Sequence, residues 1–132
     1  MVPLRSLELL RKLTPDFERL REFEERLGVS GCCVFVLRAL DLKASVHVRF
    51  FAPSVGVHED PATGSAAGAL GAYLVAHKAL GSRNPVSFSI EQGLEMRRPS
   101  LITVTVHHDQ NVPTLVKVSG KAVTVLKGEI IL

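Results

Sequence analysis

The sequence has few aromatic residues and few cysteines, and each shortage excludes a class of protein. Aromatic residues make up 5% of the 132 positions and tryptophan is absent, so we do not expect a surface that binds nucleic acid by stacking bases. The two cysteines, Cys32 and Cys33, are adjacent in an apolar segment, which predicts buried, unreactive thiols. No apolar run approaches the roughly 20 residues of a membrane-spanning helix, and no secretory signal pattern is present. We therefore expect a cytoplasmic protein with no membrane partner.

The residues that are present are typical of one soluble globular domain with a sizeable core. Apolar residues make up 46% of the chain and charged residues 22%, which is an ordinary balance. The net charge of +3 and the isoelectric point near 9.1 are compatible with a nucleic-acid partner, but lysine and arginine are spread along the chain rather than clustered. We expect no nucleic-acid partner, and a mild positive field that favours small anions.

The most informative segment is Glu59–Gly68, in which an acidic pair is followed by a proline and then by a Gly-Ser step that opens an apolar helix. Thr63 or Ser65 can serve as the helix N-cap, and the free N–H groups of the first turn, together with the helix dipole, favour a bound carboxylate or phosphate. Asp60 is close enough to act on such an anion. The alternative is a structural role, because acidic residues before a helix also stabilise its dipole.

The helix that follows is expected over residues 65–80. It is apolar on all sides, which predicts burial all round. Gly68 and Gly71 lie inside it at a cost in helix propensity, so we expect surrounding strands to pack closely against them. Gly81 suits the left-handed position that ends a helix.

The rest of the chain predicts a strand-rich domain. Thr14-Pro15-Asp16 predicts an N-cap with proline at the first helical position, for a helix that runs to about Arg26 and is ended by Gly28; a shorter helix is expected over residues 6–12. Strands are expected over residues 31–38, 45–52, 86–92, 101–107, 114–119, 121–126 and 129–132. Short connections with turn residues favour a meandering sheet. The predicted class is α+β, with a mixed, largely antiparallel sheet wrapped around one apolar helix.

The histidines predict little chemistry. His47 is expected to point outward from its strand, and His77 is expected to be structural. The run His107-His108-Asp109 predicts a strand-end turn rather than a metal site, because no further ligands follow at a supporting spacing. His58 is the exception, since it precedes Asp60 by two residues and could border a bound ligand.

Three segments resemble the C-terminal half of phenazine-biosynthesis PhzF-like proteins, which are relatives of diaminopimelate epimerase. They are Arg49–Gly68 with its Glu-Asp-Pro-Ala-Thr-Gly-Ser motif, Gln92–Ser100 and Val118–Val123. Arg97 and Ser119 depart from the family pattern, because glycine usually stands at both positions. The resemblance extends from about residue 1 to the end of the chain and implies a single domain, 1–132, with half of a diaminopimelate epimerase-like fold, a barrel-like sheet around a central helix.

Members of this family usually have two similar halves with the active site in the cleft between them. The N-terminal half supplies a catalytic glutamate beside a Gly-Asn-Pro motif, and a histidine. Nothing in this chain resembles that half: Asn84-Pro85 is preceded by Arg83 and has no glutamate nearby. The resemblance therefore implies a half enzyme that needs a complementary N-terminal half.

The resemblance also implies a mechanism, which is proton transfer on a small carboxylic acid without a cofactor or a metal. Asp60 and Ser65 would be catalytic. The substrate-binding residues would be His58, Thr63, Gly64, Ser65 and Ala66. The competing hypothesis is a non-catalytic small-anion-binding or assembly domain, in which a homodimer covers the cleft face.

Overall fold

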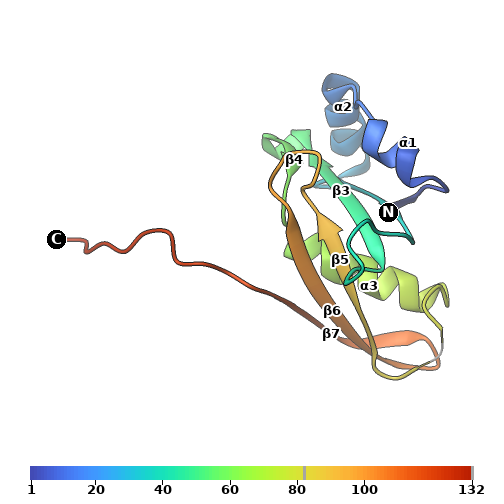
Figure 1. The fold of residues 1–132 in the computed structure, drawn as a ribbon. Coiled ribbons are helices and arrows are strands. Elements are labelled where there is room, and N and C mark those ends of the chain that lie inside the picture. The colour runs from blue at the N-terminus through green and yellow to red at the C-terminus, as the bar shows by residue number, and fades with distance from the viewer. Residues whose placement is uncertain (82, 132) are drawn as a thin grey trace.

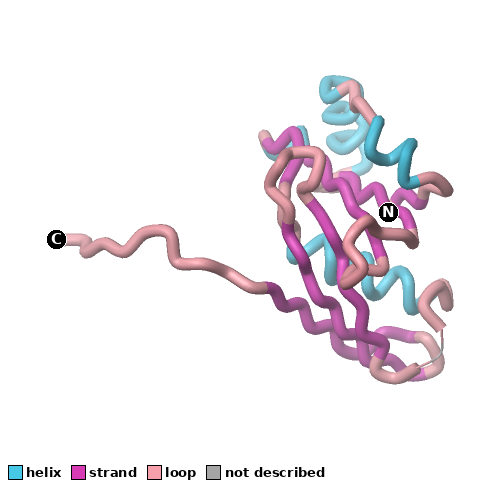
Figure 2. Tube along the Cα trace, in the orientation of Figure 1, coloured by secondary structure: helices cyan, strands magenta, loops and turns pink. Residues whose placement is uncertain are grey.

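The structure is a computed structural model that describes residues 1–81 and 83–131. Helices and strands alternate irregularly along the chain (Figure 2). The helices are α1 (Leu7–Lys12), α2 (Phe17–Leu27) and α3 (Gly64–Ala76), with a 3₁₀ turn η1 (Pro53–Val55). The strands are β1 (Val2–Pro3), β2 (Cys32–Val36), β3 (Val46–Ala52), β4 (Val57–Asp60), β5 (Val86–Gln92), β6 (Ser100–Asp109) and β7 (Val112–Gly120).

The strands form one mixed sheet with the order β1-β2-β3-β5-β6-β7. Strand β4 lies off this path and pairs with the end of β3, at Phe50 and Ala52, whereas β5 pairs with its beginning. The pairs β1–β2 and β3–β5 are parallel, and the remaining pairs are antiparallel. The chain meanders through β5, β6 and β7 as expected, but between β3 and β5 it crosses through β4 and α3, so that β3 and β5 run parallel. The α+β class and the mixed sheet are confirmed. The sheet is open, with edges at β1 and β7, so the barrel-like closure is not found.

Helix α3 lies across one face of the sheet (Figure 1). A Cβ atom at Gly71 would lie 2.6 Å from Val104 Cγ1, and one at Gly68 would lie 3.2 Å from Val118 Cγ2. These two glycines therefore allow the close packing that the sequence predicts. The helix is not buried all round, however, because an open sheet covers only one side and leaves Ser65, Ala69 and Ala76 exposed. It also ends at Ala76 rather than near residue 80.

The sheet has a core on each of its faces, and strand β2 contributes to both. Cys33 and Phe35 pack into the core with α3. Val34 and Val36 point to the opposite face, where α1 and α2 cover them. Successive side chains of a strand point to opposite faces, so a strand covered on both sides is apolar throughout. This explains why residues 32–36 show little alternation.

The two N-terminal helices begin at side-chain caps. Ser6 caps α1 by accepting a hydrogen bond from the Leu9 N–H, and Asp16 caps α2 by accepting one from the Arg19 N–H at 3.1 Å. The prediction of Thr14 as the second cap is therefore wrong, because the Asp16 carboxylate reaches the third helical residue and leaves Pro15 outside the helix. Gly28 ends α2 with φ +64°, as expected.

Residues 121–131 form an extended tail that leaves the body of the domain (Figure 1). They are exposed throughout and contain neither helix nor strand, so the strands predicted over 121–126 and 129–132 are wrong for these residues; Leu132 lies outside the described residues. Gly120 pairs with Ile102, and β6 begins only two residues before that, at Ser100. The neighbouring strand thus ends where the tail begins.

Candidate functional site

The loop between β4 and α3 holds the site that the sequence indicates. Asp60 ends β4, and Thr63 occupies the N-cap position of α3. The Thr63 side chain does not cap the helix; its Oγ1 donates a hydrogen bond to Asp60 Oδ2 at 2.6 Å. The N-cap position is therefore as predicted, but the hydroxyl orients the Asp60 carboxylate instead.

The first turn of α3 consequently presents free donors. The first helical hydrogen bond runs from the Ala67 N–H to the Thr63 carbonyl at 2.9 Å, so the preceding N–H groups have no partner within the helix. Among the described residues, the N–H groups of Gly64, Ser65 and Ala66 donate no hydrogen bond. Three free donors and the positive end of a 13-residue helix make this turn suitable for an anion.

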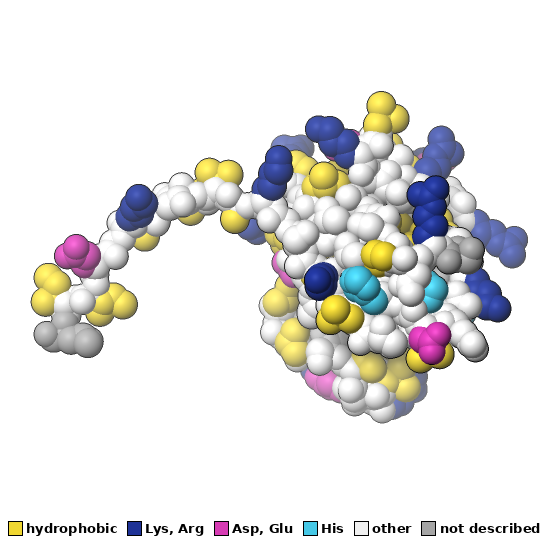
Figure 3. Space-filling model, turned by 90° about the horizontal axis from the view of Figure 1, so that it is seen from below, with side chains coloured by type: hydrophobic (Ala, Val, Ile, Leu, Met, Phe, Trp, Pro, Cys, Tyr) yellow, Lys and Arg dark blue, Asp and Glu magenta, His cyan; other side chains and the backbone are white. Residues whose placement is uncertain are grey.

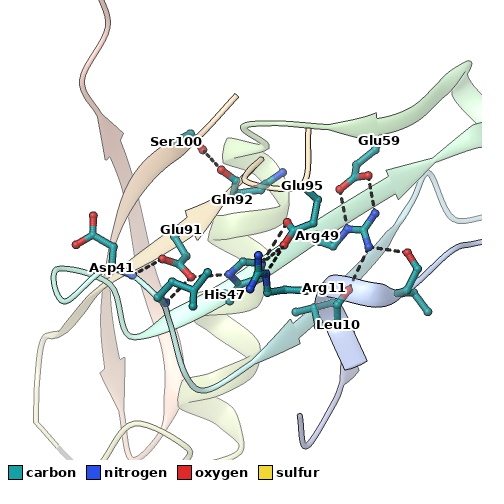
Figure 4. Close-up of polar contacts among 12 residues, drawn as sticks. Leu10, Arg11, Asp41, His47, Arg49, Glu59, Glu91, Gln92, Glu95 and Ser100 are labelled. Carbon is teal, nitrogen blue, oxygen red and sulfur yellow. Dashed lines mark hydrogen bonds and ion pairs between the residues drawn. The ribbon is translucent and has the colours of Figure 1, made fainter. Parts of the chain in front are cut away.

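The segment Gln92–Ser100 braces this loop, a contact that sequence reasoning missed. Gln92 Nε2 donates to the Asp60 carbonyl at 2.7 Å and to Thr63 Oγ1 at 2.9 Å, while its Oε1 accepts from the Thr63 N–H at 3.3 Å. Ser100 Oγ donates to the Pro61 carbonyl at 2.8 Å, and Ser100 and Gln92 lie side by side on β6 and β5 (Figure 4). Two motifs far apart in the sequence thus form one structure. The sequence held a signal for this contact, because both segments belong to the family pattern.

The backbone geometry explains why glycine is needed at Gly93 and how other residues are accommodated at Arg97 and Ser119. Gly93 has φ +80°, and a Cβ atom there would lie 2.3 Å from the Arg98 carbonyl oxygen and 2.8 Å from that of Pro61. Arg97, where the family usually has glycine, keeps φ +57°, so the turn retains the left-handed conformation at some cost in strain. Ser119 lies within β7 opposite Thr103, where an ordinary residue is tolerated.

The two acidic residues of the motif have different roles. Glu59 forms a bidentate ion pair with Arg49, whose Nε and Nη2 each lie 2.8 Å from a carboxylate oxygen. This hydrogen-bonded carboxylate raises the pKa of Arg49. Arg49 also donates to the carbonyls of Leu10 and Leu13 and so ties β3 to the end of α1 (Figure 4). Glu59 is therefore structural, and Asp60 is the acidic residue left at the open end of α3.

The predicted site residues lie partly together. Asp60, Ser65 and Ala66 line one hollow of about 500 Å³, which also touches Cys33 and Phe50. His58 packs elsewhere: its ring stacks on Phe17 of α2, with ring centroids 4.4 Å apart. A larger hollow of about 960 Å³ lies between α1 and the C-terminal end of α3; it does not touch Asp60 or the first turn of α3, although Glu95 of the Gln92–Ser100 segment lines it.

His47 is buried, which corrects the expectation that it points outward. Its Nδ1 lies 2.5 Å from Glu91 and its Nε2 3.3 Å from Glu95 (Figure 4). Glu91 also accepts hydrogen bonds from the N–H groups of Leu40 and Asp41. Because both faces of β3 are covered, alternation along this strand does not separate buried from exposed positions.

The two thiols are poorly placed for chemistry. Cys33 is 3% exposed, and burial raises the pKa of its thiol to about 12; burial also raises the pKa of the neighbouring Cys32. A thiol held protonated is a weak nucleophile. The expectation of a buried thiol is confirmed for Cys33, whereas Cys32 is only half-buried.

Within 1–81 and 83–131, no three His, Cys, Asp or Glu side chains are grouped closely enough to bind a metal ion. None of the helices in these ranges combines the length and apolar character required to cross a bilayer.

Several known proteins are similar to this chain over almost its whole length. An uncharacterized isomerase of Clostridium acetobutylicum is 40% identical over 133 aligned residues, which cover all of this chain and 44% of that protein. Trans-2,3-dihydro-3-hydroxyanthranilate isomerase of Pseudomonas fluorescens is 37% identical over 131 residues, 99% of this chain and 44% of that enzyme. The crystal structure of a PhzF family phenazine biosynthesis protein of Bacillus anthracis superposes with a TM-score of 0.83 at 26% identity and covers 98% of this chain.

The chain spans less than half the length of these relatives, since it covers 44% of each. The sequence model of one protein family matches residues 1–128, a range that includes all three motif segments. The family is described as phenazine biosynthesis-like protein, PhzC-PhzF, and this chain belongs to it.

Proposed function

We propose that this chain forms one wall of the active site of a PhzF-like isomerase and acts together with a complementary N-terminal half. The observation that carries the proposal is the open N-terminus of α3, where the Asp60 carboxylate is held by Thr63 at 2.6 Å beside three unpartnered N–H groups. A carboxylate-bearing substrate would accept hydrogen bonds from these groups. The isomerase names of the relatives support the same class of reaction.

In this mechanism the chain binds and orients its substrate and assists the movement of a proton. The N–H groups of Gly64, Ser65 and Ala66 would bind the substrate carboxylate and stabilise negative charge that develops when a proton leaves the adjoining carbon. Asp60 and Ser65 would exchange a proton with the substrate, and an acid–base group from the other half would complete the transfer. The reaction removes a proton from one carbon and adds a proton to another. No electrons are gained or lost, so the reaction needs no redox cofactor.

The bracing by Gln92 and Ser100 supports this assignment. Catalytic groups act efficiently when their surroundings fix them in one geometry. Gln92 is 1% exposed and bonds both Asp60 and Thr63, so the loop that carries Asp60 is held from behind by a rigid strand. The hollow of about 500 Å³ in front of it is open, and a second domain would exclude water from it.

The test is a chimera in which this chain replaces the matched 44% of the C. acetobutylicum isomerase. We expect it to convert trans-2,3-dihydro-3-hydroxyanthranilate, the substrate that the P. fluorescens relative is named for, with deuterium incorporation in D₂O, while this chain alone gives no turnover. Asp60→Asn, which keeps an oxygen acceptor for Thr63, should lower the rate by about 100-fold or more. Asp109→Asn, at the exposed end of β6, is the control.

A binding experiment separates catalysis from anion binding. Titration of the chain with sulfate should shift the amide resonances of Gly64, Ser65 and Ala66, and leave those of the exposed tail unchanged. Sulfate binding without turnover in the chimera would favour the non-catalytic anion-binding alternative. Turnover by this chain alone, or an unchanged rate with Asp60→Asn, would contradict the proposal.

A further inference from the structure

The larger hollow, between α1 and the C-terminal end of α3, arises from the shape of one edge of the sheet. Strand β1 pairs with β2 only at Val34 and Phe35, whereas β2 continues to Val36. The chain turns away after β1 to begin α1 at Leu7, so no described strand lies beside the end of β2 on this edge. The hollow of about 960 Å³ has the size of a site for a small organic ligand.

The lining of this hollow carries an excess of positive charge. Its charged side chains are four basic and two acidic ones, a formal charge of +2: Arg5, Arg11, Lys12, Arg38, Glu8 and Glu95. Each acidic side chain pairs with a basic one, at nitrogen–oxygen distances of 2.6 and 3.5 Å. Within the described residues, the exposed Arg5 and Arg38 form no ion pair.

The two unpaired arginines favour an anion with two charges. A group of Lys and Arg side chains stands along the right-hand side of the body in Figure 3, the side on which α1 and the end of α3 lie in Figure 1. Guanidinium groups bind phosphate through paired, charge-assisted hydrogen bonds. A phosphate monoester carries a charge of about −1.5 to −2 at neutral pH, which matches the charge of the lining.

Glu95 offers an acceptor at the same hollow. Its side chain is 12% exposed, and among the described residues its Oε1 has no hydrogen-bond partner. His47 Nε2 and Arg11 Nε lie 3.2 and 3.5 Å from this oxygen (Figure 4). Buried polar atoms without a partner are rare. Because the Arg11 side chain is 54% exposed, an N–H donor of a ligand can take its place beside Glu95.

Aromatic side chains provide a wall for a flat ring. Tyr73 and His77 stack with their ring centroids 4.1 Å apart, and Tyr73 meets Phe35 edge-on at 6.0 Å. All three residues line the hollow. A flat ring packs favourably against such side chains. One stacked pair accommodates one ring rather than a strand of nucleic acid, in keeping with the scarcity of aromatic residues.

We propose that this hollow is a second ligand site, separate from the open end of α3, and that it takes a nucleoside monophosphate. Arg5 and Arg38 bind the phosphate, the ring packs against Tyr73 and His77, and an N–H group of the ring bonds Glu95. A phosphate monoester that carries a flat ring with an N–H donor meets all three features of the lining. None of these groups acts at the open end of α3, so the inference does not rest on the proposed function.

The experiment is calorimetric titration with AMP, adenosine and inorganic phosphate, on this chain alone and on the C. acetobutylicum chimera. We expect both proteins to bind AMP at least 10-fold more tightly than either fragment. Arg5→Gln and Arg38→Gln should each weaken AMP binding about 10-fold and leave adenosine binding unchanged. Arg26→Gln makes the same charge change at an exposed position outside this hollow and should have no effect. Thermal melting checks that the variants fold.

A change in the ligand tests the contact with Glu95 without disturbing the buried His47 beside it. Purine riboside 5′-monophosphate lacks the amino group of adenine and should bind about 10-fold more weakly than AMP. The amide resonances of Leu37, Arg38 and Tyr73 should shift when AMP binds.

The alternative results separate this inference from the proposed function. Equal binding of AMP and inorganic phosphate, or of AMP and purine riboside 5′-monophosphate, overturns the inference. Shifts confined to Gly64, Ser65 and Ala66 place AMP at the open end of α3 and also overturn it. Binding by the chain but not by the chimera means that the rest of the protein covers the hollow, with the same consequence. Turnover in the chimera without AMP binding contradicts only this inference, whereas AMP binding without turnover contradicts only the proposed function.

Discussion

The loop that opens α3 and the tail beyond β7 are both marked by sequence, but only the loop is held by the rest of the chain. Residues 60–63 receive hydrogen bonds from Gln92 and Ser100, two residues that precede and follow the turn after β5. Residues 121–131 receive none from the described residues. A local sequence pattern predicts the secondary structure that a segment prefers. Whether the segment adopts it depends on hydrogen-bond partners that lie elsewhere in the chain.

The two regions also differ in the kind of surface they present. The open end of α3 presents polar donors on a rigid frame, which suits a small anion. The tail presents exposed apolar side chains on an extended backbone. Three of the five predictions that follow compare a position in the body of the domain with a position in the tail.

The largest difference should appear in thiol labelling. Iodoacetamide at pH 8 should modify the thiol introduced by Val125→Cys, at a position 93% exposed, about 1,000-fold faster than Cys33. A pKa of about 12 instead of 9 leaves roughly 1,000-fold less thiolate at this pH. Mass spectrometry of the separate peptides measures both rates. Equal rates would contradict the burial of β2.

The same thiol predicts a pH dependence of stability. Since the pKa of Cys33 is raised on folding, its contribution is complete below pH 9 and decreases as the pH rises from 9 through about 12. The loss should be about 1.4 kcal/mol per pH unit in that range. Urea unfolding of the parent and of Cys33→Ala gives the comparison: the parent's advantage over the variant should shrink as the pH rises above 9 and then reverse.

Gly93→Ala should have the next largest effect. Its Cβ would lie 2.3 Å from the Arg98 carbonyl oxygen at a φ of +80°, so the backbone that braces the site must move. We expect a loss of about 3 kcal/mol in the free energy of unfolding, measured by urea denaturation. Gly128→Ala in the tail, where nothing lies within 4 Å, should change it by less than about 0.5 kcal/mol.

Gln92→Met should have a smaller effect. Methionine has a similar shape, so the change chiefly removes the hydrogen bonds to Asp60 and Thr63 and leaves buried groups without partners. The expected loss is about 2 kcal/mol, with faster amide exchange in the first turn of α3. Thr124→Val in the tail is the matched polar-to-apolar control and should be neutral. A neutral Gln92→Met would mean that the loop is held by other contacts.

Arg97→Gly should have the smallest effect and the opposite sign. Arg97 has φ +57°, a conformation that costs a non-glycine residue about 1 kcal/mol. We expect the free energy of unfolding of the variant to be higher by up to that amount. The NMR chemical shifts of Gln92 and Ser100 should not change. A loss of stability would indicate that the arginine side chain makes contacts that outweigh the strain.

Much of this fold could be predicted from sequence because the signals were local. Gly28 ended a helix, Gly68 and Gly71 predicted close packing, and the strands after α3 alternated over a single buried face. His47 could not be predicted, because β3 is covered on both faces and its buried polar position depends on Glu91, which lies far along the chain. The division of roles between Glu59 and Asp60 depends similarly on Arg49.

The sequence by itself determined the family, through its motifs, and most of the secondary structure, through residue preferences that act over a few positions. Only the tertiary structure decided that Gln92 and Ser100 hold the Asp60 loop, that Thr63 orients a carboxylate instead of capping a helix, and that the sheet stays open. It also decided that the tail is not a strand within this chain. The reason is physical. A strand needs a neighbouring strand to satisfy its backbone hydrogen bonds, and β6, the neighbour of β7, does not extend beyond Ser100.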